Sequence, residues 1–289
     1  MDISATVFWQ SILNGLALGW IYILMALGLT LIFGIMHIMQ FAHGEIYMLG
    51  AYAAYYLAVT LGLPIFWATG LSMLVMALAG LFLERFLFRQ FKEDWLSACV
   101  AAVGLTLILQ SGAIAMFGLD HKNLPVLAEG PFHITDSIIV PKDRMIAVLV
   151  ALFLSLVLYL FLKATKYGQA MVASAQSPEG AILQGIGPDK MAALSMGIGS
   201  ALAAAGGVLA GSMVQMSPSM GTLTLIKGFT IIVIGGMGSL LGTVIAGLGL
   251  GLIDGLFPIL VGHAWASTGP LFFVIIVFMI KPQGLFGHE

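Results

Sequence analysis

The chain is a succession of long apolar runs separated by short polar segments. Hydrophobic residues make up 60% of the 289 positions and charged residues only 8%, whereas a soluble domain averages about 25% charged residues. A helix needs roughly 20 mostly apolar residues to cross a bilayer, where its backbone must satisfy its own hydrogen bonds. The sequence therefore predicts an all-α, polytopic membrane protein that forms a single domain over 1–289.

Eight or nine of the apolar runs are interpreted as membrane spans. The run 222–236 is the short one, and the sequence leaves open whether it crosses the membrane or re-enters. Interruptions are expected near 34–44 and 235–239, where glycines and polar residues break the apolar pattern. The expected spans are 9–33, 45–62, 64–83, 96–118, 145–162, 191–213, 222–236, 239–257 and 267–280.

Positively charged residues are unevenly divided between the polar segments, which predicts the orientation of the chain. Loops 84–95 and 163–190 together with Lys281 carry seven of the eleven Lys and Arg residues (three, three and one), whereas loop 119–144 carries three. Nine spans then place the N-terminus outside and the C-terminus in the cytoplasm. The net charge of −2 gives no indication of nucleic-acid binding.

Glycines recur at a spacing of four residues within the apolar runs. Without side chains, such positions let helix backbones approach closely, which favours helix association where burial from water gives no driving force. The sequence therefore predicts glycine-lined helix contacts. The pairs are Gly15 and Gly19, Gly207 and Gly211, Gly238 and Gly242, and the run Gly247, Gly251 and Gly255.

Few polar side chains lie within the spans, and each has two interpretations. His43 and Glu45, on either side of Gly44, could border a gate, but Glu45 is more simply explained as stabilising the start of a helix. Lys227 is better explained as reaching toward the membrane surface than as a substrate contact. Asp254 is interpreted as a satisfied carboxylate near a helix end. Asn14 is interpreted as an interhelical hydrogen-bonding residue rather than a substrate contact.

Enzyme signatures are missing from the sequence. It has no His-Glu-x-x-His zinc motif, no Gly-x-Ser-x-Gly nucleophile motif and no Walker A loop, and Cys99 is its single cysteine. We therefore expect no catalytic residues, no metal site and no cofactor in this chain. If transport is driven by ATP, another subunit must hydrolyse it, and segment 163–190 is the suitable surface for that subunit to contact.

Two blocks of the sequence are specific enough to point to a family. They are Phe41-Ala42-His43-Gly44-Glu45 and the ending Pro-Gln-Gly-Leu-Phe-Gly at 282–287; segments 28–34, 168–186, 197–211 and 235–239 match as well. In these blocks, and in their order along essentially the whole chain, the protein strongly resembles the LivH-type permease of branched-chain amino-acid ABC importers.

The resemblance implies a permease subunit in the bacterial inner membrane. Its expected partners are a second homologous permease, two cytoplasmic ATPase subunits that bind ATP and Mg²⁺, and a periplasmic binding protein that delivers leucine, isoleucine or valine. Segment 163–190 becomes the cytoplasmic coupling segment. Its expected ATPase-contacting residues are Gly168, Ala170, Pro178, Glu179, Ala181, Leu183, Gly185 and Ile186.

The substrate path is expected where helices are interrupted, since broken helix ends offer polar groups to a substrate. An apolar path between two permeases suits aliphatic side chains, and rocking of helices along glycine faces would give alternating access. Candidate path residues are Asn14, Gln40, His43, Gly44, Glu45, Gly235, Gly236, Gly238 and Ser239.

The coupling segment departs from the family pattern in being poor in charge. Gln169, Gln176 and Ser177 stand where relatives often carry charged residues, and Glu179 is its one acidic residue before Asp189. Docking is therefore expected to rely on packing of apolar side chains, namely Met171, Ile182, Leu183 and Ile186.

Two other functions remain open from the sequence. The first is an ABC permease for urea or short amides, because selectivity in such importers resides largely in the binding protein. The second is an ion-coupled secondary transporter or channel, which would need a buried carboxylate at mid-membrane. Glu45 and Asp254 both fall near the ends of predicted spans, which argues against the second alternative.

Overall fold

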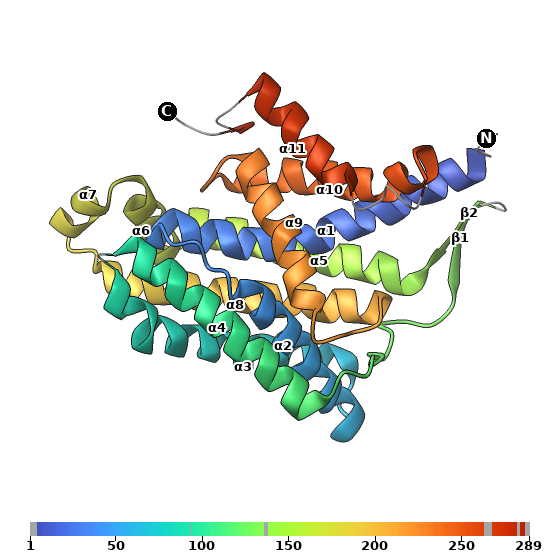
Figure 1. The fold of residues 1–289 in the computed structure, drawn as a ribbon, viewed down its shortest axis with the longest axis horizontal. Coiled ribbons are helices and arrows are strands. Elements are labelled where there is room, and N and C mark those ends of the chain that lie inside the picture. Colours follow the sequence, from blue (N-terminus) through green and yellow to red (C-terminus); the bar gives the residue numbers. More distant parts are fainter. Residues whose placement is uncertain (1–4, 93, 136–137, 263–267, 282–283, 287–289) are drawn as a thin grey trace.

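The computed structural model describes residues 5–92, 94–135, 138–262, 268–281 and 284–286, and the chain is built mainly from helices (Figure 1). A π-helical turn, Tyr56–Thr60, extends the second helix, and a 3-10 turn, Phe88–Phe91, follows the third. The helices are α1 (Ala5–Met36), α2 (His43–Tyr55), α3 (Ile65–Phe86), α4 (Trp95–Phe117), α5 (Lys142–Ala164), α6 (Lys166–Gln176), α7 (Pro178–Leu183), α8 (Pro188–Met213), α9 (Met220–Gly235), α10 (Leu240–Leu260) and α11 (Gly269–Ile280).

All nine expected spans coincide with helical elements, so the predicted all-α polytopic fold is confirmed. Within the described residues, six helices are long and apolar enough to cross a membrane: α1, α3, α4, α5, α8 and α10. The other three elements, α2, α9 and α11, are shorter. In Figure 1, α9 runs across α1 and α8 instead of along them, so 222–236 is not a span parallel to the long helices.

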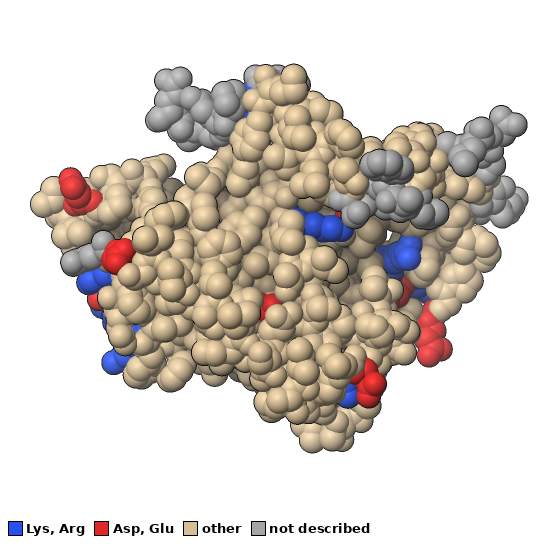
Figure 2. All heavy atoms as spheres, in the orientation of Figure 1, with Lys and Arg blue, Asp and Glu red and all other residues tan. Residues whose placement is uncertain are grey.

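A hairpin that the sequence interpretation did not contain projects from one end of the bundle. Its strands are β1 (Pro131–Thr135) and β2 (Ile138–Pro141), antiparallel with Pro131 opposite Pro141. It lies at the opposite end of the long axis from α6 and α7 (Figure 1). Figure 2 shows that charged residues gather mostly toward these two ends and that the broad middle is almost free of charge, as a protein embedded in a bilayer requires.

Helix α1 runs through the centre of the bundle and packs along α10 and α8. The contact with α10 is made by glycines: a Cβ atom on Gly15 would lie 2.6 Å from the carbonyl oxygen of Gly251, and one on Gly19 would lie 3.0 Å from that of Gly247. These approaches confirm the close helix contacts predicted from glycine spacing. Gly207 packs in the same way on the backbone of Tyr47, where a Cβ atom would overlap the carbonyl oxygen.

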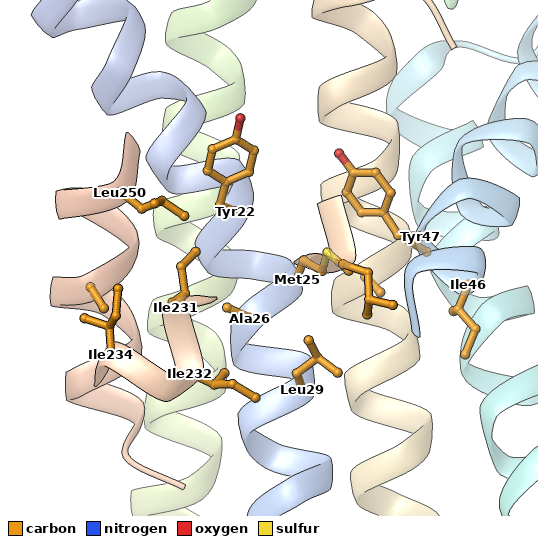
Figure 3. Packing of buried hydrophobic residues seen from close by; sticks show 14 of the residues in the cluster. Tyr22, Met25, Ala26, Leu29, Ile46, Tyr47, Ile231, Ile232, Ile234 and Leu250 are labelled. Atoms are coloured by element: carbon orange, nitrogen blue, oxygen red, sulfur yellow. The ribbon is translucent and has the colours of Figure 1, made fainter. Parts of the chain in front are cut away.

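One large hydrophobic cluster joins α1, α2, α9 and α10, with further residues from α3, α8 and α11 (Figure 3). Met25 and Leu29 of α1 lie between Ile46 of α2 and Ile232 of α9. Tyr22 and Tyr47 border this cluster, and in Figure 3 both hydroxyl groups point to the same side, away from the aliphatic residues. The short helices α2 and α9 are thus anchored on the central helix.

Candidate functional site

The first interruption carries the chain from the end of α1 back into the bundle. Helix α1 ends at Met36, His37 adopts a left-handed backbone conformation with φ of 55°, and α2 begins at His43. A Cβ atom on Gly28 of α1 would lie 2.8 Å from His43 Nε2, and Gly28 precedes Met36 by about 12 Å at a rise of 1.5 Å per residue. The start of α2 therefore lies inside the fold.

Glu45 is thus near the end of its helix, as expected, but that helix end lies inside the fold. His43, Glu45 and Gln40 are all fully buried, with exposed fractions of 0%, 0% and 1%. Glu45 is in the first turn of α2, where a carboxylate stabilises the helix dipole. The structure is therefore compatible with both interpretations of His43-Gly44-Glu45, as residues that border a gate and as residues that stabilise a helix start. The reason is that the start of α2 is also a polar site in the interior.

Two oxygen atoms of this polar group have no hydrogen-bond partner among the described residues: Oε2 of Glu45 and Oε1 of Gln40. Glu45 Oε1 accepts a long bond of 3.4 Å from the Thr222 hydroxyl, and Gln40 Nε2 lies 3.9 Å from Met196 Sδ. Buried polar atoms without partners are costly, so such groups usually meet water or a ligand. Thr222 is a contact that the sequence analysis did not identify.

Gly44 brings the start of α9 directly onto the start of α2. A Cβ atom on Gly44 would overlap the carbonyl oxygen of Gly221, and one on Gly221 would overlap that of Gly44. Neither glycine has a positive φ, so both are required by the closeness of the two backbones. The predicted path residue Gly44 thus belongs to the contact that fixes α9 across the bundle.

The second interruption separates α9 from α10. Gly236 and Gly238 have φ values of 97° and 86°, in the region that favours glycine. Ser239 caps α10 by accepting a hydrogen bond of 3.1 Å from the Gly242 amide. Gly235 packs on Gly242, since a Cβ atom on Gly235 would lie 2.5 Å from the Gly242 carbonyl carbon.

The chain's ending closes the C-terminal end of α9. The amides of Leu285 and Phe286 donate to the carbonyl oxygens of Ile234 and Gly235, at 2.7 and 3.1 Å, so groups that a helix end leaves free are satisfied. Gly284 has a φ of 82°. These bonds give a structural reason for the middle of the 282–287 block; Pro282, Gln283 and Gly287 lie outside the described residues.

Both interruptions line one hollow, of about 520 Å³, beside the coupling segment. Gly34 and His37 come from the first interruption, and Gly238 and Ser239 come from the second. The two are close together, because a Cβ atom on Gly238 would lie 3.9 Å from Gly34 Cα. Helix α6 supplies the wall opposite them, with Met171, Val172, Ala175 and Gln176.

The coupling segment forms two short helices, α6 and α7. Thr165 caps α6 by accepting from the Gly168 amide at 3.0 Å, and Ser177 caps α7 by accepting from the Gly180 amide at 3.1 Å. Pro178 stands at the first position of α7, where a missing amide proton costs nothing.

The residues expected to contact an ATPase divide into an exposed and a buried set. Pro178, Glu179, Leu183 and Gly185 are exposed, whereas Gly168 and Ala181 are buried and Ala170 and Ile186 are half-buried. Among the four apolar residues expected to make the docking contact, Ile182 and Leu183 are 55% and 86% exposed. Met171, however, is fully buried. The expectation that Met171 docks a partner is therefore wrong, because its side chain holds α6 on the bundle.

Asn14 lies far from both interruptions, near the hairpin end of the bundle. Its side-chain oxygen accepts a hydrogen bond from the guanidinium group of Arg144 at the start of α5. Beside Arg144, Asp143 accepts from the Leu127 amide at 2.7 Å and holds the loop that precedes the hairpin. The interhelical role expected for Asn14 is confirmed, and the structure does not bring it together with the other path candidates.

Lys227 and Asp254 are paired with each other, an arrangement that the sequence analysis did not anticipate. The Lys227 ammonium group forms an ion pair with Asp254 Oδ2 and donates to the Tyr22 hydroxyl at 2.8 Å. Tyr22 in turn donates to Asp254 at 3.0 Å. Lys227 therefore does not reach for the surface as an isolated cation. The presence of one Lys and one Asp in neighbouring apolar runs could have predicted this ion pair.

Comparison with known proteins places these features in a family. Residues 11–280 match the family model described as branched-chain amino acid transport system / permease component. The permease protein LivH of a high-affinity branched-chain amino acid transport system from Escherichia coli is 31% identical, over 97% of this chain and 96% of its own. BraD of Pseudomonas aeruginosa, named for the same kind of system, is 30% identical over 96% and 95%.

Two further matches are more distant. A probable branched-chain amino acid transport permease protein LivH from Methanocaldococcus jannaschii is 26% identical over 92% of this chain. The solved structure of PsaBC from Streptococcus pneumoniae in complex with Fab matches with a TM-score of 0.50 at 16% identity, over 93% of this chain and 91% of that one. At that identity the likeness concerns the fold alone.

Proposed function

We propose, because the chain belongs to the family of branched-chain amino acid transport permease components, that it carries leucine, isoleucine and valine through the membrane of an ATP-driven importer. As a member of this family, the chain is a membrane permease and not itself an ATPase. Permeases of this class act with ATPase and binding-protein partners. We infer two ATPase subunits, which bind ATP and Mg²⁺, and a second homologous permease.

The observation that best supports this function is the meeting of both interruptions and α6 in one hollow. An ATPase that pushes on the exposed surface of α7 would move α6, which packs on α5 and α1. The chain contains no Walker A loop, so the force has to come from such a partner. Movement of α6 would then change the space between Gly34 and Gly238, where the helices are already broken.

We place the substrate path beside α9 and the start of α2, between this chain and the second permease. Gln40, His43, Gly44 and Glu45 would supply polar groups in the interior, and the second interruption would form the inner gate with Gly235, Gly236, Gly238 and Ser239. Broken helix ends serve substrate sites in this way in other transporters. We leave Asn14 out of the substrate path, because its hydrogen bond to Arg144 accounts for a polar side chain at this position.

The orientation follows from the same assignment. ATPase contact at α7 places that end of the bundle in the cytoplasm and the hairpin end in the periplasm of a bacterial inner membrane. The loop 119–144, which contains the hairpin, then becomes the surface on which a loaded binding protein docks.

The test is reconstitution from a native membrane. The tagged chain is purified in mild detergent, its co-purifying proteins are identified, and the complex is placed in proteoliposomes with ATP inside and the binding protein outside. We expect a second permease and an ATPase to co-purify and radiolabelled leucine to be taken up. Vanadate should abolish uptake, and a protonophore should leave it unchanged.

Other outcomes would overturn the proposal in recognisable ways. Uptake of urea but not leucine would assign the importer to small amides. Leucine uptake that survives vanadate but is lost with a protonophore would indicate an ion-coupled transporter. If the chain purifies without any ATPase and uptake needs no ATP, the proposed coupling role of α6 and α7 is contradicted.

A further inference from the structure

Three side chains from three helices form a charged cluster inside the bundle. Lys227 comes from α9, Asp254 from α10 and Tyr22 from α1, joined by the ion pair and hydrogen bonds described above. The Lys227 ammonium group also lies 4.6 Å from the centre of the Tyr22 ring, a distance at which a cation is attracted to the face of an aromatic ring. The tyrosine thus contacts both charges.

The cluster lies at membrane depth. Tyr22 precedes Met36 by about 21 Å along α1, at 1.5 Å per residue, and the hydrocarbon core is roughly 30 Å thick. Charged side chains at such depth are costly; they usually pair with one another in the bundle interior or face a water-filled cavity, and they mark substrate and ion pathways. The position conflicts with the sequence-based interpretation of Asp254 as a carboxylate at a span end.

The two charges are not equally covered. The Lys227 side chain is 30% exposed and the Asp254 side chain 9%, so the ion pair opens toward the outer face of α9. Leu223 and Ile226, at 67% and 57% exposed, stand on that face. Together with Lys227 and Thr230, these two residues occupy positions i, i+3, i+4 and i+7 of α9 and form one stripe along the helix. Lys227 is the charged residue of this stripe. The stripe therefore places one ion pair beside aliphatic surface.

We propose that Lys227, Asp254 and Tyr22 bind the zwitterionic end of an amino acid during its passage. The carboxylate of the substrate pairs with Lys227, its ammonium group pairs with Asp254, and its aliphatic side chain lies on Leu223 and Ile226. The site rests on the proposed function, in which the stripe on α9 faces the path between two permeases.

Exchange of partners explains why an ion pair suits this task. Before binding, the two protein charges neutralise each other; after binding, each is neutralised by the opposite charge of the substrate. No uncompensated charge is left in the membrane interior in either state, which avoids the main cost of burying ions. A neutral solute such as urea would gain nothing from separating the pair, so the cluster favours amino acids over small amides.

The first experiment removes both charges while keeping the shapes. In the reconstituted importer, the double variant Lys227→Met with Asp254→Asn retains similar side-chain volumes and leaves no unpaired ion. We expect its melting temperature and ATPase co-purification to match the wild type, whereas the rate of leucine uptake at saturating loaded binding protein falls about tenfold or more, since two charge-assisted contacts are lost. The control is Arg85→Met, which removes an exposed positive charge at the end of α3, away from the α9 stripe.

The second experiment needs no variant and decides the matter if the double variant fails to assemble. The melting temperature of the wild-type permease complex, without binding protein, is measured with leucine, isoamylamine or 4-methylpentanoate at equal concentration. Leucine should stabilise the complex, and the two analogues, which lack one charged group each, should not. Equal stabilisation by all three, or unchanged leucine uptake by an assembled double variant, would overturn the site. Absence of leucine uptake by the wild type would instead contradict the proposed function.

Discussion

At the scale of single residues, glycines position the polar site by allowing two helix backbones to touch. Gly44 and Gly221 touch backbone to backbone, and this contact holds the start of α9 against the start of α2. In a membrane, close backbone approach replaces the hydrophobic drive that would join helices in water. The polar residues His43 and Glu45 are therefore positioned by a glycine that stands between them.

Replacing Gly44 with alanine tests this contact. The added methyl group overlaps the Gly221 carbonyl, so we expect a loss of about 1–3 kcal/mol of stability, typical of overpacking, and a lower melting temperature in detergent. Gly70→Ala is the control. Gly70 is an exposed residue of α3 with nothing within 4 Å of an added Cβ atom, so alanine should stabilise that helix by about 0.5–1 kcal/mol. Equal melting temperatures for the two variants would contradict the contact.

Gly185 is required for a different reason, its backbone conformation. Its φ is 78°, and no atom lies within 4 Å of an added Cβ atom. In Gly185→Val only the left-handed conformation is penalised, by about 1–2 kcal/mol. The turn between α7 and α8 should shift while the bundle stays folded, so ATP hydrolysis should become uncoupled from uptake. Gly187→Val, at a φ of −75°, is the matched control. Coupled transport by Gly185→Val would argue against α7 as the contact.

At the scale of elements, α7 is a short helix whose outer side is apolar and uncovered. Leu183 is 86% exposed beyond the end of the helical bundle, where no lipid chain would cover it in the proposed orientation. An exposed apolar patch in water marks a contact with another protein. The buried Ala181 and Met171 explain why the same segment also stays attached to the bundle.

Leu183→Asp should therefore break a contact without unfolding the chain. We expect the amount of ATPase that co-purifies with the variant to fall about tenfold or more, as for an apolar anchor at an interface, at an unchanged melting temperature. Leu119→Asp provides the control, since Leu119 is 72% exposed in the loop after α4, on the other side of the membrane. Loss of ATPase from both variants would point to general instability.

The helices also show which features of the fold could be predicted from the sequence. The apolar runs sufficed for the nine helices other than α6 and α7, which lie in the polar segment 163–190, since length and hydropathy are local properties. They could not indicate that α9 crosses α1, because this depends on contacts between residues as distant as Gly44 and Gly221. The same holds for Met171, for which small and apolar character could not distinguish burial in the bundle from exposure to a partner.

At the scale of the whole molecule, the two interruptions were predictable but their meeting was not. Glycines near 34–44 and 235–239 signal breaks, yet only the packed bundle brings Gly34 beside Gly238 and both beside α6. Likewise, the sequence alone favours a Lys227 side chain that extends to the membrane surface. Only the structure shows that Asp254 is its ion-pair partner. Sites assembled from distant segments require the tertiary structure.

The asymmetry of the molecule yields a prediction about its orientation in the membrane. Charged residues gather at the two ends (Figure 2), and the proposed ATPase contact assigns the α7 end to the cytoplasm. Cys99 is the single native cysteine, so Cys99→Ala gives an unlabelled parent. Exposed positions at opposite ends, Asn123→Cys and Glu179→Cys, then report which side each end faces.

A membrane-impermeant maleimide should label Asn123→Cys in intact spheroplasts and Glu179→Cys only in inverted vesicles. The physical reason is the excess of lysine and arginine in loops 84–95 and 163–190, which retains those loops on the cytoplasmic side during insertion. Because α6 and α7 belong to loop 163–190, the reverse labelling pattern would place the coupling segment outside the cell. ATP-driven coupling at α7 would then be impossible, whatever the substrate.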